Sequence, residues 1–535
     1  MGAGPAFITK GSATYTHLLD PRPWYKNTRL IILNFWIAIM LITSCTNGYD
    51  GSMMNGLQSL TQWNQAFNYP AGGTLGLLNA IQSIGSLSAY PFAPYMADGM
   101  GRRFSIIFGA SLMIVAAVIQ TASHSIQMFI GARFMIGFGQ TFAATAAPLL
   151  VTEVAYPSHR GRATSLYNAL WYLGSIIAAW TTYGTFTIPT SWSWRIPSAL
   201  QALTSTIQVL LIWFVPESPR WLVSKGKEER ALQVLAYYHA DGNAQDPLVE
   251  YEFAEIKAAI AFDREVAANV GWLSLIKYPG NRKRLRIIIA LAVFSQWSGN
   301  GLVSYYLNKV FTAIGITDPE TQLLINGVLN TFNLFFAVTA GFCCDRVGRR
   351  PLFLASCAGM IVFWAAQTIC FAIHQETGSI AAGDAVIAFI FLYFAFYSIA
   401  FSPLVVSYTV EILPFALRAK GFIVFNFMIS VSLIFNQYVN PIALEALQWK
   451  YYLVYLFWLC FECVFCYFFI IETKNHTLEE TAVIFDGDTD MAQIHNVAGT
   501  HAGLTHCEGE GEGEGEGEIE IQEKKTFESQ VEMTD

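Results

Sequence analysis

The sequence predicts an all-α membrane protein in which twelve transmembrane helices form two pseudo-symmetric six-helix bundles. Its 535 residues are 54% hydrophobic and 15% aromatic, and only 13% are charged. A soluble protein has about 25% charged residues, so the composition favours a membrane protein. Twelve apolar runs are long enough to cross a bilayer, and three short motifs recur once in each half of the chain. The recurrence is what predicts two bundles rather than one.

Each apolar run supplies the roughly 20 residues that a helix needs to span the hydrocarbon core. Many of the runs contain Gly, Pro, Ser or Thr, which membrane helices use for close packing and local kinks. The predicted spans are 30–49, 73–96, 104–123, 126–149, 164–185, 196–215, 286–309, 321–342, 351–373, 384–408, 420–440 and 450–471.

A charged linker separates the sixth run from the seventh. Its stretches KGKEERALQVLAYY and EYEFAEIKAAI predict short amphipathic helices at a membrane surface. After the last run, the acidic repeat EGEGEGEGEGE cannot bury apolar surface, so we expect a largely disordered tail that is either passive or bound by cytosolic regulators. The predicted organisation is a cytoplasmic N-terminal segment (1–29), a first bundle (30–215), the cytoplasmic linker (216–285), a second bundle (286–471) and a cytoplasmic tail (472–535).

The orientation in the membrane follows from lysine and arginine, which concentrate in cytoplasmic loops. The opposite loops contain chiefly Arg195, with Lys309 and Lys450 at their borders. The first 29 residues lack the apolar core of a cleavable signal peptide, so the first span itself should direct insertion, with both termini cytoplasmic. The basic loops contain the linker and Arg102, Arg103, Arg160, Arg162, Arg346, Arg349, Arg350, Arg418 and Lys420.

Three motifs appear in the same order in both halves. DGMGRR after the second span matches DRVGRR after the eighth, and EVAYPSHRG after the fourth matches EILPFALRA after the tenth. PESPR after the sixth span corresponds to IETKN after the twelfth. Three matches in register indicate a duplicated six-helix unit, and such repeats place a substrate site at the midplane between the halves.

These motifs resemble the sugar porter family of the major facilitator superfamily over about residues 30–480. GYDGSMMNG at 48–56 and FSQWSGNGLVSYYLNKV at 294–310 are similar to the fungal lactose and cellodextrin permease group. The resemblance implies two bundles that rock around a central sugar site in the plasma membrane.

The charged motif residues are predicted to form a cytoplasmic gate. Ion pairs between helix ends would latch the two bundles, and exposed pairs worth about 0–1 kcal/mol each can break when the bundles rock. The alternative is that these charges only set the topology. The predicted gate residues are Asp98, Arg102, Arg103, Glu153, Arg160, Glu217, Arg220, Asp345, Arg349, Arg350, Glu411, Arg418 and Glu472.

Two ionisable residues near or within the spans are candidates for proton coupling. Asp50 closes the first predicted span and Arg133 lies within the fourth. Charges inside a bilayer are costly and are usually paired and functional. An arginine that approaches and leaves Asp50 would let it release and take up a proton in each cycle. Hexose facilitators of the family also have an acid here, so uniport stays open, and Glu462 has no evident partner.

The predicted sugar site is centred on the seventh span, because amides bind hydroxyls and aromatic rings bind the CH face of a sugar. Gly299 and Gly301 would let this helix break and expose backbone to a ligand. The residues of this span are Gln296, Trp297, Asn300, Tyr305 and Tyr306. By resemblance, Asn168 and Asn330 contact sugar hydroxyls, and Asn426 and Asn436 are weaker candidates. For any single amide, the alternative is helix–helix packing.

Some residues depart from the pattern of hexose carriers. A pair of glutamines in the seventh span is here Ser295-Gln296, and a pocket tryptophan is replaced by Val406. The space left by the missing indole is compatible with a disaccharide.

The sequence therefore predicts a proton-coupled carrier for a β-linked disaccharide such as lactose or cellobiose. The alternatives are a monosaccharide facilitator and a sugar sensor of the same fold. No Walker A or H-E-x-x-H motif points to an enzyme, and no cofactor, metal site or nucleic-acid partner is expected. Cys460, Cys463 and Cys466 lie in an apolar run and are interpreted as small apolar side chains of one helix.

Overall fold

The computed structural model describes residues 18–19, 24–269, 271–402, 404–413, 415–473 and 485. Within its helices, the side chains at 161–162, 164–165, 168–169, 262–269, 340–346, 415–416 and 419 are outside the description. Most of the predicted N-terminal segment and nearly all of the predicted tail, including 508–518, lie outside the described residues. Residues Met1–Phe485 group as one compact unit and Asp486–Asp535 as a second.

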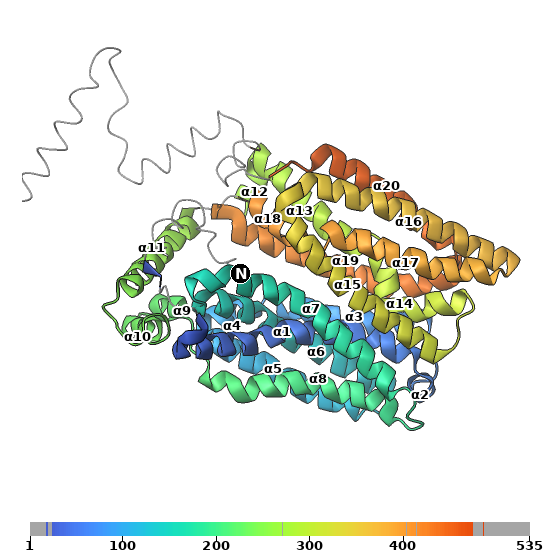
Figure 1. Cartoon of the computed structure of the whole chain (residues 1–535), viewed down its shortest axis with the longest axis horizontal. Helices are drawn as coiled ribbons and strands as arrows, with labels where there is room; N and C mark the ends of the chain where they lie inside the picture. The colour runs from blue at the N-terminus through green and yellow to red at the C-terminus, as the bar shows by residue number, and fades with distance from the viewer. Residues whose placement is uncertain are drawn as a thin grey trace, which may run out of the picture. The chain divides into compact units, whose positions relative to one another are not determined.

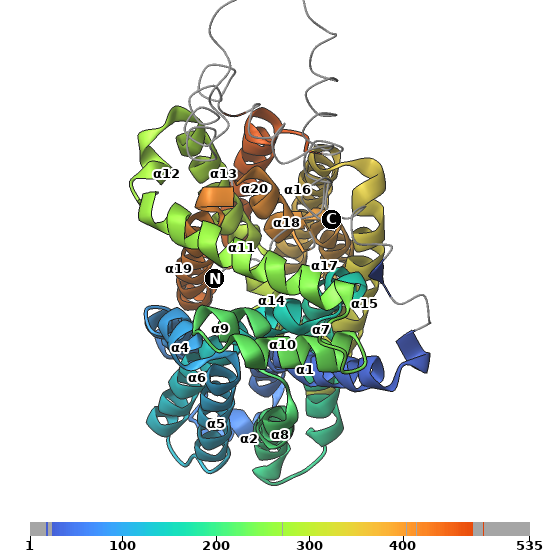
Figure 2. The same ribbon diagram turned by 90° about the vertical axis from the view of Figure 1, so that its left-hand side faces the viewer.

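Helices of the N-terminal half lie on one side of the first unit and those of the C-terminal half on the other (Figures 1 and 2). The N-terminal half contains α1 (Thr28–Ser59), α2 (Thr61–Ala66), α3 (Gly72–Ala89), α4 (Ala93–Met100), α5 (Arg102–Thr121), α6 (Ile126–Val154), α7 (Pro157–Thr185) and α8 (Trp192–Leu211). The C-terminal half contains α13 (Pro279–Trp297), α14 (Asn300–Ala313), α15 (Pro319–Val347), α16 (Arg349–Thr377), α17 (Ile380–Ala400), α18 (Leu404–Ile412), α19 (Phe415–Leu447) and α20 (Lys450–Phe469).

The linker forms α9 (Pro219–Ser224), α10 (Glu228–His239), α11 (Pro247–Asn269) and α12 (Ser274–Lys277). Helices α9, α10 and α11 lie at one end of the bundles, which we call the linker end (Figures 1 and 2). The opposite end, where α1 finishes and α2 begins, is the far end. Arg29 attaches α10 to α1, because its guanidinium lies 4.4 Å from the centre of the Tyr237 ring and donates to the Tyr237 carbonyl.

Each predicted span coincides with helix in the structure. By length and apolar composition, ten helices of the described residues can cross a membrane. Helices α3 and α7 coincide with the second and fifth predicted spans and are not among those ten. They pack inside the bundle with the others. The main difference is at α1, which continues to Ser59 instead of ending at 49, so Asp50 lies within the helix and not at its end.

Local sequence explains several helix ends. The Asn27 side chain caps α1 by accepting from the backbone N–H groups of Arg29 and Leu30. Gly101 and Gly348 separate the helices on either side of the duplicated arginine pairs, with φ of 109° and 108°, conformations that favour glycine. The same backbone turn therefore occurs at the same position of both halves.

The helix contacts of the two halves correspond. Helix α1 packs on α7 as α13 packs on α19, and α5 packs on α6 and α8 as α16 packs on α17 and α20. Between the halves, α3 packs on α19 and α15 packs on α7. Exchanging the halves converts each of these two contacts into the other, which is the pattern of a pseudo-twofold axis between two six-helix bundles. The predicted fold class is confirmed.

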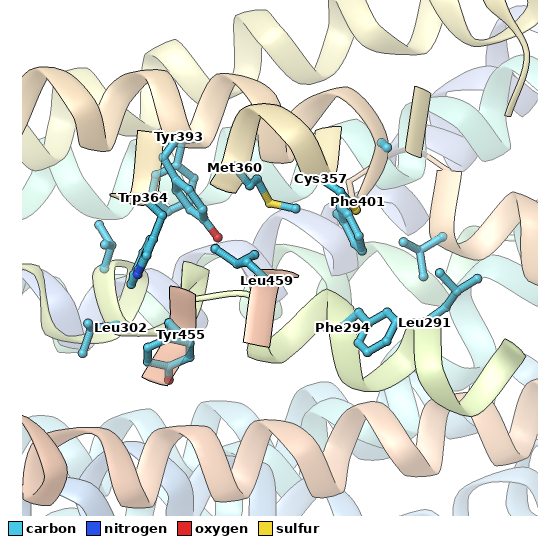
Figure 3. Close-up of a cluster of buried hydrophobic side chains, with 14 of the residues drawn as sticks. Leu291, Phe294, Leu302, Cys357, Met360, Trp364, Tyr393, Phe401, Tyr455 and Leu459 are labelled. Carbon is cyan, nitrogen blue, oxygen red and sulfur yellow. The ribbon is translucent and has the colours of Figure 1, made fainter. Parts of the chain in front are cut away.

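The core of the C-terminal half surrounds the seventh span (Figure 3). Leu291 and Phe294 of α13 and Leu302 of α14 are buried in the same cluster as Trp364 and Tyr393. Figure 3 shows these side chains on both sides of the break between α13 and α14. The break is therefore held by packed apolar groups rather than left in open space.

Glycine permits a close crossing of α1 and α7 in the N-terminal half. A Cβ at Gly48 would lie 1.8 Å from the Trp171 carbonyl oxygen, and one at Gly174 would lie 1.9 Å from that of Cys45. Because both clashes are with backbone, the helices would have to separate.

We expect Gly48→Ala to lower the free energy of unfolding by about 1–3 kcal/mol or more, since the crossing cannot adapt by a rotamer change. Thermal unfolding of the detergent-solubilised chain, followed by size-exclusion chromatography, measures the effect. Gly184→Ala in α7 is the control, because a Cβ there meets no atom within 4 Å. Equal stability of the two variants would contradict the close crossing.

Candidate functional site

The two halves contact each other through amides at the far end. Asn55 of α1 receives a hydrogen bond at Oδ1 from the backbone of Leu307 and donates from Nδ2 to Asn326, at 3.2 and 3.1 Å. The Gln58 side chain donates to the backbone carbonyl of Tyr305 at 2.9 Å, and the backbone carbonyl of Gln58 accepts from the Asn308 side chain at 3.1 Å. These buried bonds join α1 to α14 and α15.

The seventh span is broken between α13 and α14, as its glycines predicted. Gly299 has a φ of 97°, in the left-handed region, and Ser298 precedes it outside the helices. A second irregularity follows at Tyr306, which has a φ of −135°. A Cβ at Gly299 would lie 2.6 Å from the Trp364 ring, so the break is packed directly against α16.

Two of the predicted sugar residues flank this break. Gln296 is half-buried, and its side-chain amide donates to Ser295 Oγ at 3.2 Å. Its backbone carbonyl accepts from the Asn436 side chain at 2.6 Å. Asn300 donates to the Tyr397 hydroxyl at 3.0 Å, and its buried Oδ1 has no partner within the described residues. Asn436, a weaker candidate from sequence, therefore caps a carbonyl freed by the break.

Tyr305 and Tyr306 lie where α14 meets α19 and the N-terminal half. The Tyr306 hydroxyl donates to the Gln437 carbonyl, and Tyr305 hydrogen-bonds the Gln437 side chain. Gln437 Oε1 also accepts from Ser83 of α3 at 2.8 Å. Gln437 thus connects the seventh span to the opposite half, a role that the sequence did not reveal.

The remaining sugar candidates lie farther from this group. Trp297 packs between Phe435 and Trp458, with ring centroids 5.1 and 5.0 Å away. Asn330 accepts from Ser175 Oγ at 2.5 Å, so it does lie between the halves. Asn426 donates to the Phe422 carbonyl of its own helix at 2.9 Å, and the Asn168 side chain lies outside the described residues.

Asp50 is fully buried within α1. Its Oδ1 accepts from Gln201 Nε2 of α8 at 2.8 Å, and its Oδ2 has no hydrogen-bond partner in the described part of the chain. Arg133 is near enough to act on Asp50 through its charge, but the two are not among the ion pairs described within 4.0 Å. The Asp50 carboxyl is thus held by the neutral amide of Gln201, and Arg133 lies beyond ion-pair distance.

Arg133 belongs to a chain of polar side chains inside the N-terminal half. Its guanidinium donates to the Leu78 carbonyl at 3.0 Å and to Gln82 Oε1 at 2.7 Å. Gln82 donates to Gln140 at 2.8 Å, and Gln140 donates to Asn47 of α1 at 2.7 Å. Arg133 also interacts electrostatically with Tyr305 and Tyr306 of the other half. It therefore lies between the predicted proton residue and the predicted sugar residues.

The charged motif of the N-terminal half forms a compact cluster at the linker end. Arg102 donates from Nε and Nη2 to both oxygens of Glu153, at 3.1 and 3.3 Å, and pairs with Asp98 at 3.2 Å. Glu217 accepts from the backbone N–H of Arg103 at 3.3 Å. Burial raises the pKa of the Glu217 carboxyl, although the N–H groups of Ser218 and Arg103 and the nearby arginine charges oppose this.

The C-terminal half contains a similar cluster at the corresponding positions. Arg349 pairs with Glu411 at 3.1 Å, as Arg102 does with Glu153. Glu472 accepts from the backbone N–H groups of Arg349 and Arg350, at 2.9 and 3.1 Å. The side chain of Asp345 lies outside the described residues.

The duplicated glycines admit these carboxylates. A Cβ at Gly101 would lie 2.7 Å from Glu217, and one at Gly348 would lie 2.8 Å from Glu472. The three repeated motifs are thus parts of one structural unit, which joins the ends of helices within a half.

The described ion pairs of Arg102 and Arg349 each lie inside one half. Arg160 reaches into the linker, where it pairs with Glu252 of α11 at 3.6 Å. Glu252 also hydrogen-bonds His239 of α10 at 2.6 Å. Arg220 lies in the first turn of α9, and Arg418 is buried in α19.

Arg102 offers a comparison of a buried and an exposed partner. We expect Glu153→Gln to lower the free energy of unfolding by about 3–5 kcal/mol at most, because it leaves a buried charge with less compensation. Asp98→Asn should cost under about 1 kcal/mol, since the Asp98 side chain is 72% exposed and that of Glu153 only 10%. Thermal unfolding in detergent measures both, and a larger effect of the Asp98 variant would contradict this cluster geometry.

Sequence reasoning missed several buried amides that organise the site, above all Gln82, Gln201 and Gln437. An amide within an apolar run is costly unless it is hydrogen-bonded, so each was a visible signal. Within the described residues, no group of three or more His, Cys, Asp or Glu side chains could hold a metal ion.

Comparison with known proteins places the chain among membrane carriers. Residues 36–485 match the family described as "Sugar (and other) transporter". The high-affinity glucose transporter of Kluyveromyces lactis is 26% identical over 468 residues, which cover 83% of each chain. The quinate permease of Neurospora africana is 28% identical over 497 residues, 86% of this chain and 89% of the permease.

Among solved structures, the inward-open form of the xylose transporter XylE from E. coli superposes with a TM-score of 0.70 at 21% identity. The match covers 84% of this chain and 99% of XylE. At this identity the likeness concerns the fold alone, and it agrees with the pseudo-twofold arrangement of the two bundles.

Proposed function

Because this chain belongs to the sugar transporter family of the major facilitator superfamily, we propose that it moves a β-linked disaccharide, lactose or cellobiose/cellodextrin, together with protons. The carrier works by alternating access in the plasma membrane, with the linker end and both termini in the cytosol. Sugar transport follows from the family, whereas the disaccharide, the proton and the orientation are the proposal.

The observation that carries the proposal is the grouping of amides and tyrosines between the halves. Gln296 and Asn300 lie on the two sides of the break in the seventh span, and Asn300 keeps an unpartnered Oδ1. Tyr305 lies beyond them at the contact with Gln437. Such a set offers donors, acceptors and an aromatic face, which together suit a carbohydrate.

Proton coupling is supported by the separation of Asp50 from Arg133. A buried carboxyl held by an amide is neutral at low cost, and it ionises when a cation approaches. Arg133 belongs to the chain of polar side chains that ends at Asn47 of α1, so a sugar that rearranges this chain can move Arg133 relative to Asp50. This is a direct route from sugar binding to proton release.

Substrate size is supported by Val406, which is 40% exposed where related hexose carriers have a large indole. A valine is smaller than an indole, which is compatible with a second sugar ring. The relatives transport glucose and quinate by name, so the specificity must be tested against these as well.

The test is uptake of radiolabelled cellobiose by the full chain in a transport-deficient host, at two external pH values. Lactose, cellobiose, glucose, xylose and quinate are added as competitors. We expect the disaccharides to compete best and uptake to rise at the lower pH. Competition by glucose alone, with no dependence on pH, would instead identify a monosaccharide facilitator. Binding without flux would identify a sensor.

A further inference from the structure

Glu462 is a third intramembrane acid, and the proposed coupling mechanism does not use it. It lies in α20 with 0% exposure, and within the described residues it has no ion pair. Its Oε1 lies 2.8 Å from Ser298 Oγ, while its Oε2 has no partner. An ionised carboxylate in such a place would be left with one neutral hydroxyl for compensation.

The position of the hydrogens can be worked out from Ser298. Its Oγ lies 2.5 Å from the Phe294 carbonyl oxygen as well as 2.8 Å from Glu462 Oε1. A carbonyl oxygen only accepts, and a serine hydroxyl has a single hydrogen. The single serine hydrogen cannot serve both contacts, and a protonated Glu462 supplies a hydrogen for the second one.

The surroundings agree with a neutral acid. The titratable groups that interact with Glu462 are Tyr393 and Tyr397 of α17, Cys357 of α16, and Cys463 and Cys466 of its own helix. None of these is a cation at any ordinary pH. Among the described residues, therefore, no cation is close enough to stabilise a negative charge on Glu462.

Ser298 stands at the break of the seventh span, where the missing helical bonds free several carbonyl groups. Tyr393 donates to the Ser298 carbonyl at 2.7 Å, and Tyr397 donates to the Ser295 carbonyl at 2.7 Å. The Phe294 carbonyl is met by Ser298 itself. Glu462 thus contacts the serine that closes this set of bonds.

We propose that Glu462 is a proton-binding site of the C-terminal half, occupied in this state, whose O–H donates to Ser298 Oγ and holds the break of the seventh span closed. The proton comes from bulk water and binds one carboxylate oxygen, and its release leaves Ser298 without a donor. The effect on the sugar, though not the protonation itself, rests on the proposed function, because Gln296 and Asn300 take their positions from this break.

The direct test is infrared spectroscopy of the purified full chain at neutral pH without sugar. We expect a C=O stretching component of a protonated carboxylic acid that disappears in Glu462→Gln and is retained in Asp50→Asn, separate from any component that belongs to the buried Asp50. Ser298→Ala should keep the band and shift it to higher frequency, because the acid loses its acceptor; this arm needs no change at Glu462. The absence of any acid component that depends on Glu462 would overturn the proposal.

Sugar affinity supplies the second readout. The amide of Glu462→Gln can still donate to Ser298, so we expect the dissociation constant for the transported sugar to stay within about twofold of the parent chain. Glu462→Ala removes the donor and should weaken binding about tenfold, the value of one buried hydrogen bond. Glu376→Gln, at an exposed position at the end of α16, is the matched control. Equal affinities of the Ala and Gln variants would overturn the role at the break, whatever the infrared result.

Discussion

Gly299→Ala is expected to reduce sugar uptake at least tenfold while the chain still reaches the membrane. Gly299 has a φ of 97°, so any side chain there is strained. In addition, the new Cβ would lie 2.6 Å from the Trp364 ring, whose indole is fully buried and donates to the Tyr452 carbonyl at 2.9 Å. The ring cannot move away, so the break must change shape.

The loss should affect binding because Gln296 and Asn300 flank the break. A displacement of about 1 Å in residues that position a substrate can cost on the order of a hundredfold in activity. Uptake of labelled sugar, normalised to surface expression, measures the loss, and sugar binding to the purified variant separates a lower affinity from slower turnover.

Gly378→Ala is the matched control for this experiment. Gly378 also has a positive φ, of 66°, but a Cβ there would meet no atom within 4 Å. It therefore carries the same type of backbone strain without the clash and should transport nearly as well as the parent chain. If both variants lose uptake equally, the contact between the break and Trp364 is not what matters.

The fold could be predicted from the sequence because the features that indicate it lie in short, continuous stretches of the chain. Each span is a continuous apolar run, and the motif repeat carries the pseudo-symmetry. The predicted end of the first span was wrong for a local reason too. Asn47, Asp50 and Asn55 are polar and interrupt the apolar run, yet all three are buried or half-buried in α1. Buried polar side chains inside a bundle look like a loop when hydropathy alone is considered.

The partners of the candidate site could not be predicted in the same way. Ser298 and Glu462 are 164 residues apart, and Ser83 and Gln437 are 354 residues apart. No periodicity encodes such pairs, which exist only once the helices have packed. The seventh span was identifiable because its amides, aromatic residues and glycines are concentrated in one short stretch.

The duplicated charges illustrate the difference between finding residues and assigning their contacts. The motifs pointed to Arg102, Glu153 and Glu217, together with their counterparts in the second half. The sequence could not say whether a carboxylate meets the arginine of its own half or of the other. In the described clusters these bonds are internal, so each cluster joins helix ends of its own half.

Asp50→Asn is expected to abolish uphill accumulation while leaving exchange of sugar across the membrane intact. One proton crossing about 100 mV supplies about 2.3 kcal/mol, and a difference of one pH unit adds about 1.4 kcal/mol. Together these support an accumulation of several hundredfold for a neutral sugar, on the order of 500 at about 1.4 kcal/mol per factor of ten. Without a titratable group at position 50, the expected ratio is about one.

The structure indicates why the substitution should spare the fold. Asp50 Oδ1 accepts only from Gln201, and an asparagine oxygen can accept the same bond. Its new N–H₂ group replaces the unpartnered Oδ2, and Arg133 keeps its bonds to Leu78 and Gln82. The substitution therefore removes none of these hydrogen bonds. Sugar binding and the movement of the loaded carrier should be unaffected, so counterflow exchange should continue.

Steady-state accumulation and counterflow are measured side by side in vesicles with an imposed proton gradient. Asp384→Asn is the control, because Asp384 is exposed near the start of α17 and undergoes the same chemical change. That variant should accumulate sugar like the parent chain. Undiminished accumulation by Asp50→Asn would assign coupling to another acid, and Glu462 would then be the first to examine. Loss of counterflow together with accumulation would instead indicate that Asp50 is needed for the helices to move.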